Sequence, residues 1–265
     1  MNALIRQSAL NDPHNVVRVT VVGTPVGTPV MPAAGTARAA VVIVGGHEGG
    51  ADVEVEPSAE RGALFRAASA RRELGEVVRE ALETTDLPVC VVPMTLGRDP
   101  RLVADAARTL MSVPVGAAAG RIVLAEPFGT ATLLTGWLRV AVAQAAGSPR
   151  ATDLAALVIA NAANRFDDAE LFRIAHLVRT QGGLPWVEVA LRGGDPGLAE
   201  GIARCEMLGA RRIALIPADF GSATGTGPGV IDGAPLLSPA AVSGVLATRT
   251  SAALLKLSRG DDGIG

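Results

Sequence analysis

A glycine-flanked histidine is the residue of this chain whose type and setting most clearly suit chemistry. His47 and Glu48 lie within the run Gly45-Gly46-His47-Glu48-Gly49-Gly50. An imidazole titrates near neutral pH and binds divalent metal ions when it is neutral. The glycines on both sides let a ligand approach the backbone closely. The run predicts a metal ligand or general base exposed to a cleft, with Glu48 as an oxygen ligand or proton acceptor; the alternative is an exposed turn that happens to contain a histidine.

Other polar loops directly follow apolar runs, where a parallel sheet collects its ligands. They contain Thr95, Glu126 and Gly129 in the first part of the chain, and Asn161 to Arg165, Asp219 and Gly221 in the second. Because the carboxyl ends of parallel strands meet at one sheet edge, we expect these residues to line a common site.

The elements that must position these loops alternate between short apolar runs and longer amphipathic segments. We expect strands at 39–44, 88–94, 121–127, 155–161, 185–191 and 211–217. We expect helices at 59–84, 100–111, 130–146, 167–181, 196–208 and 239–258. The strands lack polar alternation, which is typical of a parallel sheet covered on both faces. Asp99-Pro100 and Asp195-Pro196 read as helix N-caps followed by proline at the first helical position, without a catalytic role.

Internal similarity indicates that the fold is duplicated. Residues 97–111 match 193–207, residues 121–132 match 212–224, and residues 41–50 match 156–165, in the same order. The sequence therefore predicts an α/β protein of two tandem duplicated βαβαβα halves with parallel sheets, at 38–148 and 149–265, with a cleft between them. Residues 1–37 are expected to be an N-terminal strand, at 16–23, and a flexible linker.

Composition excludes several classes of partner. The 265 residues carry a net charge of −2, only 3% are aromatic and tyrosine is absent, which argues against nucleic acid. No apolar stretch is long enough for a membrane span. Cys90 and Cys205 form no CxxC pair, so a reducing, cytoplasmic location is expected. No nucleotide-binding loop and no nucleophile elbow occur. Whether the chain is a monomer or a homo-oligomer stays open.

Two stretches resemble a known family. Val44-Gly45-Gly46-His47-Glu48-Gly49 looks like a variant of the strand followed by Gly-His-Gly-Ser that opens the class II chelatases, the sirohydrochlorin chelatases of sirohaem and vitamin B12 synthesis. LGARRIALIPADF (208–220) is similar to the stretch before the family's third strand. The resemblance covers both halves, although Asn161-Ala162 stands where the second half would have its own Gly-His.

The resemblance implies ATP-independent insertion of Co²⁺ or Fe²⁺ into a sirohydrochlorin-type tetrapyrrole, in cobalamin or sirohaem biosynthesis. The metal is then a substrate, and no nucleotide is required. The implied catalytic residues are His47 and Glu48, and the implied metal ligands are His47, Glu126 and Asp219. The implied substrate-binding residues are Arg98, Thr95, Asn161, Arg165, Gly129 and Gly221. Since one histidine stands where the family has two, the alternative is a non-catalytic tetrapyrrole- or metal-binding carrier or regulator that kept the fold.

Overall fold

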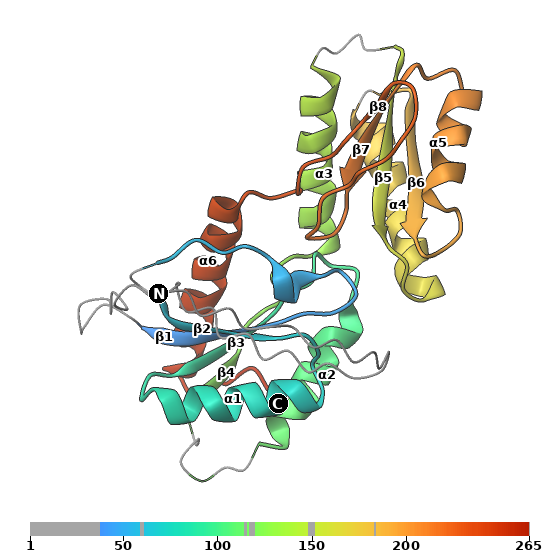
Figure 1. Ribbon diagram of the computed structural model, residues 1–265. Coiled ribbons are helices and arrows are strands. Elements are labelled where there is room, and N and C mark those ends of the chain that lie inside the picture. The colour runs from blue at the N-terminus through green and yellow to red at the C-terminus, as the bar shows by residue number, and fades with distance from the viewer. Residues whose placement is uncertain are drawn as a thin grey trace, which may run out of the picture.

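The computed structural model of the protein describes residues 38–58, 61–113, 116, 120–147, 152–182 and 184–264. These residues form two four-stranded parallel sheets with helices packed around them (Figure 1). The predicted α/β class with two parallel sheets is therefore confirmed. The strand expected at 16–23 and the linker after it lie outside the described residues.

The first sheet has the strand order β2-β1-β3-β4. Its strands are β1 (Ala39–Val44), β2 (Arg61–Ala67), β3 (Val89–Pro93) and β4 (Ile122–Leu124). The short 3-10 helix η1 (Gly50–Asp52) and the helices α1 (Arg72–Thr84) and α2 (Pro100–Met111) connect them. Every residue of β1 is buried, which explains why its sequence is apolar throughout.

The second sheet repeats this arrangement with the order β6-β5-β7-β8. Its strands are β5 (Leu154–Asn161), β6 (Trp186–Arg192), β7 (Arg212–Pro217) and β8 (Val230–Ile231). Helices α4 (Arg165–Gly182) and α5 (Leu198–Met207) pack against it. Strands β1 and β5 thus hold the same place in their sheets, as the matched segments 41–50 and 156–165 predict.

Two helices pack on the sheet of the opposite half. Helix α3 (Ala131–Ala146) packs on α4 and β7, whereas α6 (Pro239–Leu257) packs on β1, β3 and β4 (Figure 1). We call the first sheet with η1, α1, α2 and α6 the first lobe, and the second sheet with α3, α4 and α5 the second lobe. The predicted halves at 38–148 and 149–265 stay a prediction, and each half contributes one helix to the lobe of the other. An apolar helix face does not reveal which sheet will cover it.

The matched segments at 97–111 and 193–207 do not hold equivalent positions in their two sheets. The first contains α2, which follows the interior strand β3, and the second contains α5, which follows the edge strand β6. Asp99 caps α2 as expected, because its Oδ1 accepts the backbone N–H of Leu102 at 3.0 Å. The cap expected at Asp195 is wrong: α5 begins at Leu198, and Gly197 holds the N-cap position.

The helix expected at 59–84 is wrong in its first part. Residues Arg61–Ala67 form β2, and α1 begins only at Arg72. Within β2, Phe65 and Ala67 are buried while Arg66 is partly exposed, the alternation of a strand with one face on the core. The arginines before α1 look like the polar face of one long helix, so the sequence pattern hides this edge strand.

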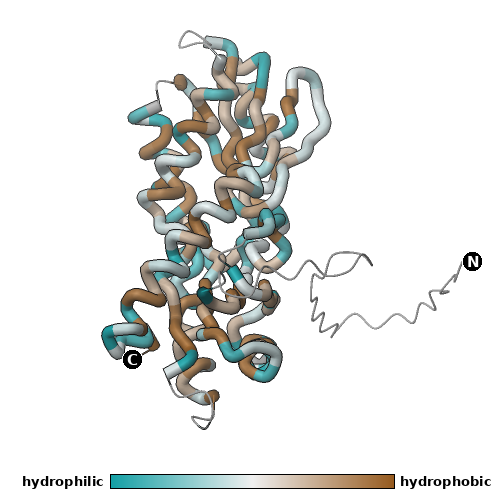
Figure 2. Tube along the Cα trace, turned by 90° about the vertical axis from the view of Figure 1, so that its left-hand side faces the viewer, coloured by the Kyte–Doolittle hydropathy of each residue, from teal (hydrophilic) through white to brown (hydrophobic). Residues whose placement is uncertain are grey.

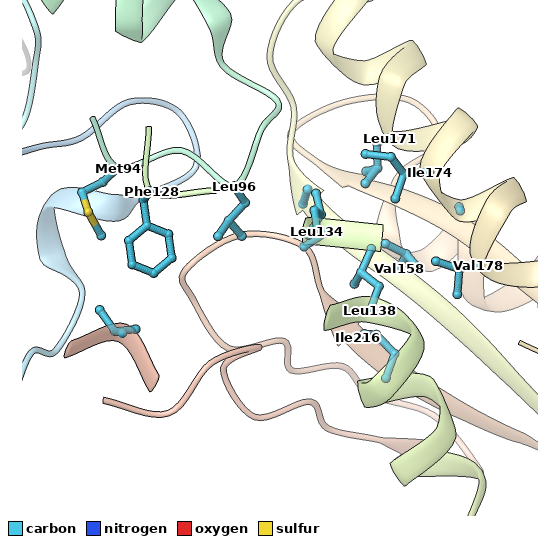
Figure 3. Packing of buried hydrophobic residues seen from close by; sticks show 14 of the residues in the cluster. Met94, Leu96, Phe128, Leu134, Leu138, Val158, Leu171, Ile174, Val178 and Ile216 are labelled. Carbon is cyan, nitrogen blue, oxygen red and sulfur yellow. The ribbon is translucent and has the colours of Figure 1, made fainter. Parts of the chain in front are cut away.

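Apolar side chains join the two lobes into one core. The cluster that contains Met94, Leu96 and Phe128 of the first lobe continues to Leu134 and Leu138 of α3 (Figure 3). The ring of Phe128 also meets that of Phe220 edge-on, with centroids 5.3 Å apart. Figure 2 shows hydrophobic and hydrophilic residues alternating along the helices. In the described part of the chain, no helix combines the length and hydropathy that a membrane span requires.

Because α3 packs on the second sheet, substitutions on its buried and exposed faces should lower the free energy of unfolding by different amounts. Leu138 is fully buried and lies near Val158 and Ile216 of the second sheet (Figure 3), whereas Val140 is 57% exposed. Leu138→Ala should lower the free energy of unfolding by about 2–5 kcal/mol, and Val140→Ala by less than about 0.5 kcal/mol. Urea unfolding measures both values. Equal losses for the two variants would contradict the packing of α3 described here.

Candidate functional site

The candidate site lies where the loop after β1 meets the carboxyl end of β5. Asn161, the last residue of β5, donates its Nδ2–H to the backbone oxygen of His47 at 2.9 Å. The backbone N–H of Phe220 donates to the oxygen of Glu48 at 3.0 Å. The histidine loop of the first lobe is thereby fixed to two loops of the second.

A carboxylate at the start of α2 orients the His47 ring. His47 Nδ1 lies 3.1 Å from Oδ2 of Asp99, whose other oxygen caps the helix. Gly46 makes this contact possible, because a Cβ at that position would lie 2.3 Å from the same Oδ2. The prediction of a histidine exposed to a cleft is corrected, because the His47 side chain is only 20% exposed and its ring turns toward Asp99 at the start of α2.

The pKa values of this pair reflect their contact. Burial lowers the pKa of His47, but the hydrogen bond that its ring donates to Asp99 and the charges of Asp99 and Glu48 outweigh this effect, so the pKa is raised above 6.5. Burial raises the pKa of Asp99, but its hydrogen bonds with His47 and the Leu102 backbone prevail and lower it. The imidazole is therefore held as a hydrogen-bond donor to an ionised carboxylate.

Asp167 of the second lobe completes a cluster of potential metal ligands. It lies in the first turn of α4, is 7% exposed and accepts a hydrogen bond from the Asn164 side chain. One donor atom from each of His47, Asp99 and Asp167 lies within 4.8 Å of the other two. Within the described ranges, no hydrogen-bond partner reaches the buried Nε2 of His47. A nitrogen and two carboxylates from both lobes thus converge on one point.

Glu48 lies beside the cluster but faces another way. It is 1% exposed, and its Oε2 accepts hydrogen bonds from the Thr95 hydroxyl and, at 3.1 Å, from the Leu96 backbone N–H. Its Oε1 has no hydrogen-bond partner among the described residues. Burial raises the pKa of Glu48 to about 7, and the hydrogen bond from Thr95 and the charge of Arg98 limit the rise. This carboxyl therefore exchanges its proton near neutral pH.

A pocket of about 340 Å³ opens between the two lobes on the Glu48 side. Its lining consists of Glu48, Gly49, Asp52, Val53 and Glu54 from the first lobe and Asn161, Arg192, Asp219, Phe220, Gly221 and Ser222 from the second. The His47 side chain belongs to the cluster with Asp99 and is not part of this lining. The site thus has two chemically different sides.

The metal ligands predicted besides His47 do not join the cluster. Glu126 is exposed, and its carboxylate pairs with Lys256 Nζ at 2.8 Å. Asp219 is buried, forms an ion pair with Arg192 and accepts the backbone N–H of Asn161 at 3.2 Å. Each carboxylate already has a cation of its own, which explains why neither turns toward His47.

Three of the predicted substrate-binding residues are buried in the structure. Arg98 is 1% exposed, and its Nη2 contacts Asn161 O and Asp168 Oδ1, both at 3.4 Å. Thr95 is 2% exposed and holds Glu48. Gly129 is buried, and a Cβ there would lie 3.0 Å from the Leu96 backbone. These residues shape the junction of the lobes instead of offering surface to a ligand.

The other three lie where a ligand could reach them. Asn161 and Gly221 line the pocket. Arg165 is exposed at the start of α4, and its guanidinium lies 4.7 Å from the ring centre of Phe166. Their roles as substrate-binding residues stay predictions.

Asp99 and Asp167 are the functional candidates that sequence reasoning missed. Asp99 is explained fully by helix capping, and Asp167 looks like an acidic residue in a first helical turn. Their positions in the sequence could have indicated them, because Asp99 follows β3 and Asp167 follows β5 by only a few residues, and ligands gather at the carboxyl ends of such strands. Only the meeting of the two lobes brings their side chains within 4.8 Å of His47 and of each other.

Comparison with known proteins assigns no function to this arrangement. No protein-family model matches the chain, and no curated protein matches it significantly. The resemblance to class II chelatases therefore depends on the two motifs quoted above.

Glu48→Gln should change how stability depends on pH. The folded protein holds the Glu48 proton up to about pH 7, whereas the unfolded chain releases it near 4.5. The stabilisation by this group is therefore complete below pH 4.5 and is lost as the pH rises to 7. Glutamine does not titrate, so the variant should gain stability relative to the wild type across this window, by on the order of 3 kcal/mol. Urea unfolding between pH 4.5 and 8 tests this, and parallel profiles would refute it.

Asp99→Asn should lower the pKa of His47. Asparagine still caps α2 but carries no charge, so the largest causes that raise the His47 pKa are weakened and the pKa should fall. An NMR titration of the His47 ring protons, assigned with a His47→Gln spectrum, measures it. An unchanged pKa would show that Asp99 does not control the ring.

Proposed function

We propose that the protein is a metal chelatase of the class II type, which inserts Co²⁺ or Fe²⁺ into a sirohydrochlorin-type tetrapyrrole in cobalamin or sirohaem biosynthesis. The observation that supports it is the convergence of His47, Asp99 and Asp167 at the junction of the lobes. Imidazole nitrogen with carboxylate oxygens suits divalent metals of the late first row. The metal here is a substrate, held before transfer.

The donor set fits one metal ion. In a tetrahedral site, two ligand atoms bound to the same ion at 2.0–2.2 Å lie roughly 3.3–3.6 Å apart. His47 Nδ1 donates a hydrogen bond to Asp99 Oδ2 at 3.1 Å, so an ion bound between these two atoms would replace that proton, and Asp167 offers a third donor atom from the other lobe. His47 Nε2 is a second buried nitrogen without a partner among the described residues, so either ring nitrogen can supply the ligand atom.

A planar substrate has a matching surface next to Asp167. Phe166 is 64% exposed although it is aromatic, and the Arg165 guanidinium lies over its ring. An exposed ring offers a flat apolar face, and a guanidinium binds carboxylates with two hydrogen bonds. A flat macrocycle with carboxylate side chains combines these two properties.

Metal insertion breaks two pyrrole N–H bonds, forms metal–nitrogen bonds and releases two protons, without any redox change. The protein must therefore hold the macrocycle and provide proton acceptors. The proposal assigns proton acceptance to His47 and to Glu48, whose Oε1 has no hydrogen-bond partner among the described residues.

The proposal sets this chemistry in the cytoplasm. Cys90 and Cys205 are free and buried, which suits a reducing compartment. The proposed partner is a small molecule.

The second candidate function is a metal or tetrapyrrole carrier or regulator without catalysis. The observation that favours it is the closed setting of His47, whose Nδ1 is engaged by Asp99 and whose ring does not line the pocket. A site that stores a metal ion without transferring it would be closed in this way.

An insertion assay separates the two functions. Sirohydrochlorin and Co²⁺ are mixed with the protein, and the visible absorbance of the product is followed. His47→Ala and Asp167→Asn should slow insertion at least about tenfold, whereas Glu126→Gln, which removes an exposed carboxylate paired with Lys256, should not.

A wild type no faster than the metal-only blank would overturn the chelatase proposal. Saturable binding of Co²⁺ or of sirohydrochlorin without insertion would then support the carrier. Absence of both would contradict the two functions together.

A further inference from the structure

The pocket beside Glu48 has an acidic lining. Four of its residues carry carboxyl groups, namely Glu48, Asp52, Glu54 and Asp219, and Arg192 is its one cation. Arg192 is already engaged, because it pairs with Asp219 and donates to the Ser222 backbone oxygen at 2.7 Å. Arg66 and Arg98 act on Asp52 and Glu48 electrostatically but do not line the pocket. A ligand inside therefore meets more negative than positive charge.

One buried acceptor of this lining lacks a donor. Glu48 is 1% exposed, and its Oε1 has no hydrogen-bond partner in the described part of the chain. A buried carboxylate oxygen without a donor is costly, and most such groups are paired. Glu48 lines the pocket, so a ligand with an N–H group would supply the missing partner there.

A metal ion does not fit this pocket. An ion bound directly needs its ligand atoms to converge within a few ångströms. Among the described residues, the His47, Asp99 and Asp167 set is the one group of three whose donor atoms lie within 4.8 Å. The carboxylates of the pocket are spread around a hollow of about 340 Å³, so their ligand must extend across it.

We infer that this pocket is a second binding site, distinct from the His47–Asp99–Asp167 cluster, for a small organic cation such as an aliphatic amine or guanidine. The ammonium or guanidinium group donates to Glu48 Oε1, and Asp52 and Glu54 at the rim attract its charge. The half-buried ring of Phe220 packs against its aliphatic chain. The volume lies at the lower end for ligand pockets, which excludes a macrocycle. The inference does not depend on the proposed function.

Binding of agmatine and putrescine to the full-length protein, measured by calorimetry at about pH 8, tests this inference. Two matched probes serve as controls, 1,4-butanediol without charge and glutarate with the opposite charge. Both amines should bind saturably and weaken as salt is raised, and neither control should bind.

Two variants locate the site. Glu48→Gln should weaken amine binding at least about tenfold, because it removes the charge at the buried acceptor. Glu54→Gln changes an exposed side chain and should weaken binding about two- to fivefold by reducing attraction at the rim. Glu126→Gln removes an exposed charge outside the lining and should have no effect.

The metal cluster supplies the last control. Asp167→Asn should abolish Co²⁺ binding and leave amine binding intact, whereas Glu54→Gln should leave Co²⁺ binding intact and weaken amine binding about two- to fivefold. Failure of one site is therefore distinguishable from failure of the other. No saturable binding of either amine, equal binding of the neutral diol, or an equal loss in Asp167→Asn and Glu54→Gln would each overturn the inference.

Discussion

One carboxylate fixes the geometry of the whole site. Asp99 caps α2 with one oxygen and holds the His47 ring with the other, and the oxygen that holds the ring lies where a Cβ at Gly46 would clash with it. The position of the imidazole therefore follows from where a helix begins, although it belongs to a glycine-rich loop. A change at Gly46 would move the ring and the helix start together.

The second lobe determines what that fixed ring can do. Asp167 reaches it from α4, while Asn161 and Phe220 hold the histidine loop from β5 and β7. The shared apolar core and the helices α3 and α6, each of which packs on the sheet of the other half, hold the two lobes in a fixed relative position. The two sides of the loop then differ in charge: Arg165 with its exposed aromatic neighbour lies near the metal cluster, and carboxylates line the pocket. The two proposed sites therefore differ in the charge that they offer a ligand.

In this chain, sequence patterns predict the helices and strands better than they predict which side chains will contact each other. The span of α2, the strand β1 and the position of His47 after it follow from apolar periodicity and capping residues. Glu126 illustrates the limit, because its partner Lys256 comes from the C-terminal helix, which packs on the first sheet. Asp167 was missed for the same reason: it reaches His47 only through the packing of two lobes. Such contacts between distant segments leave no local pattern.

If His47, Asp99 and Asp167 bind one divalent ion between the lobes, crystals soaked in CoCl₂ should reveal it by anomalous scattering at the cobalt absorption edge. We expect one strong peak within bonding distance of all three side chains, and its loss in Asp167→Asn crystals. A peak at Glu126 or Asp219 in place of this one, or no peak beside His47, would contradict it.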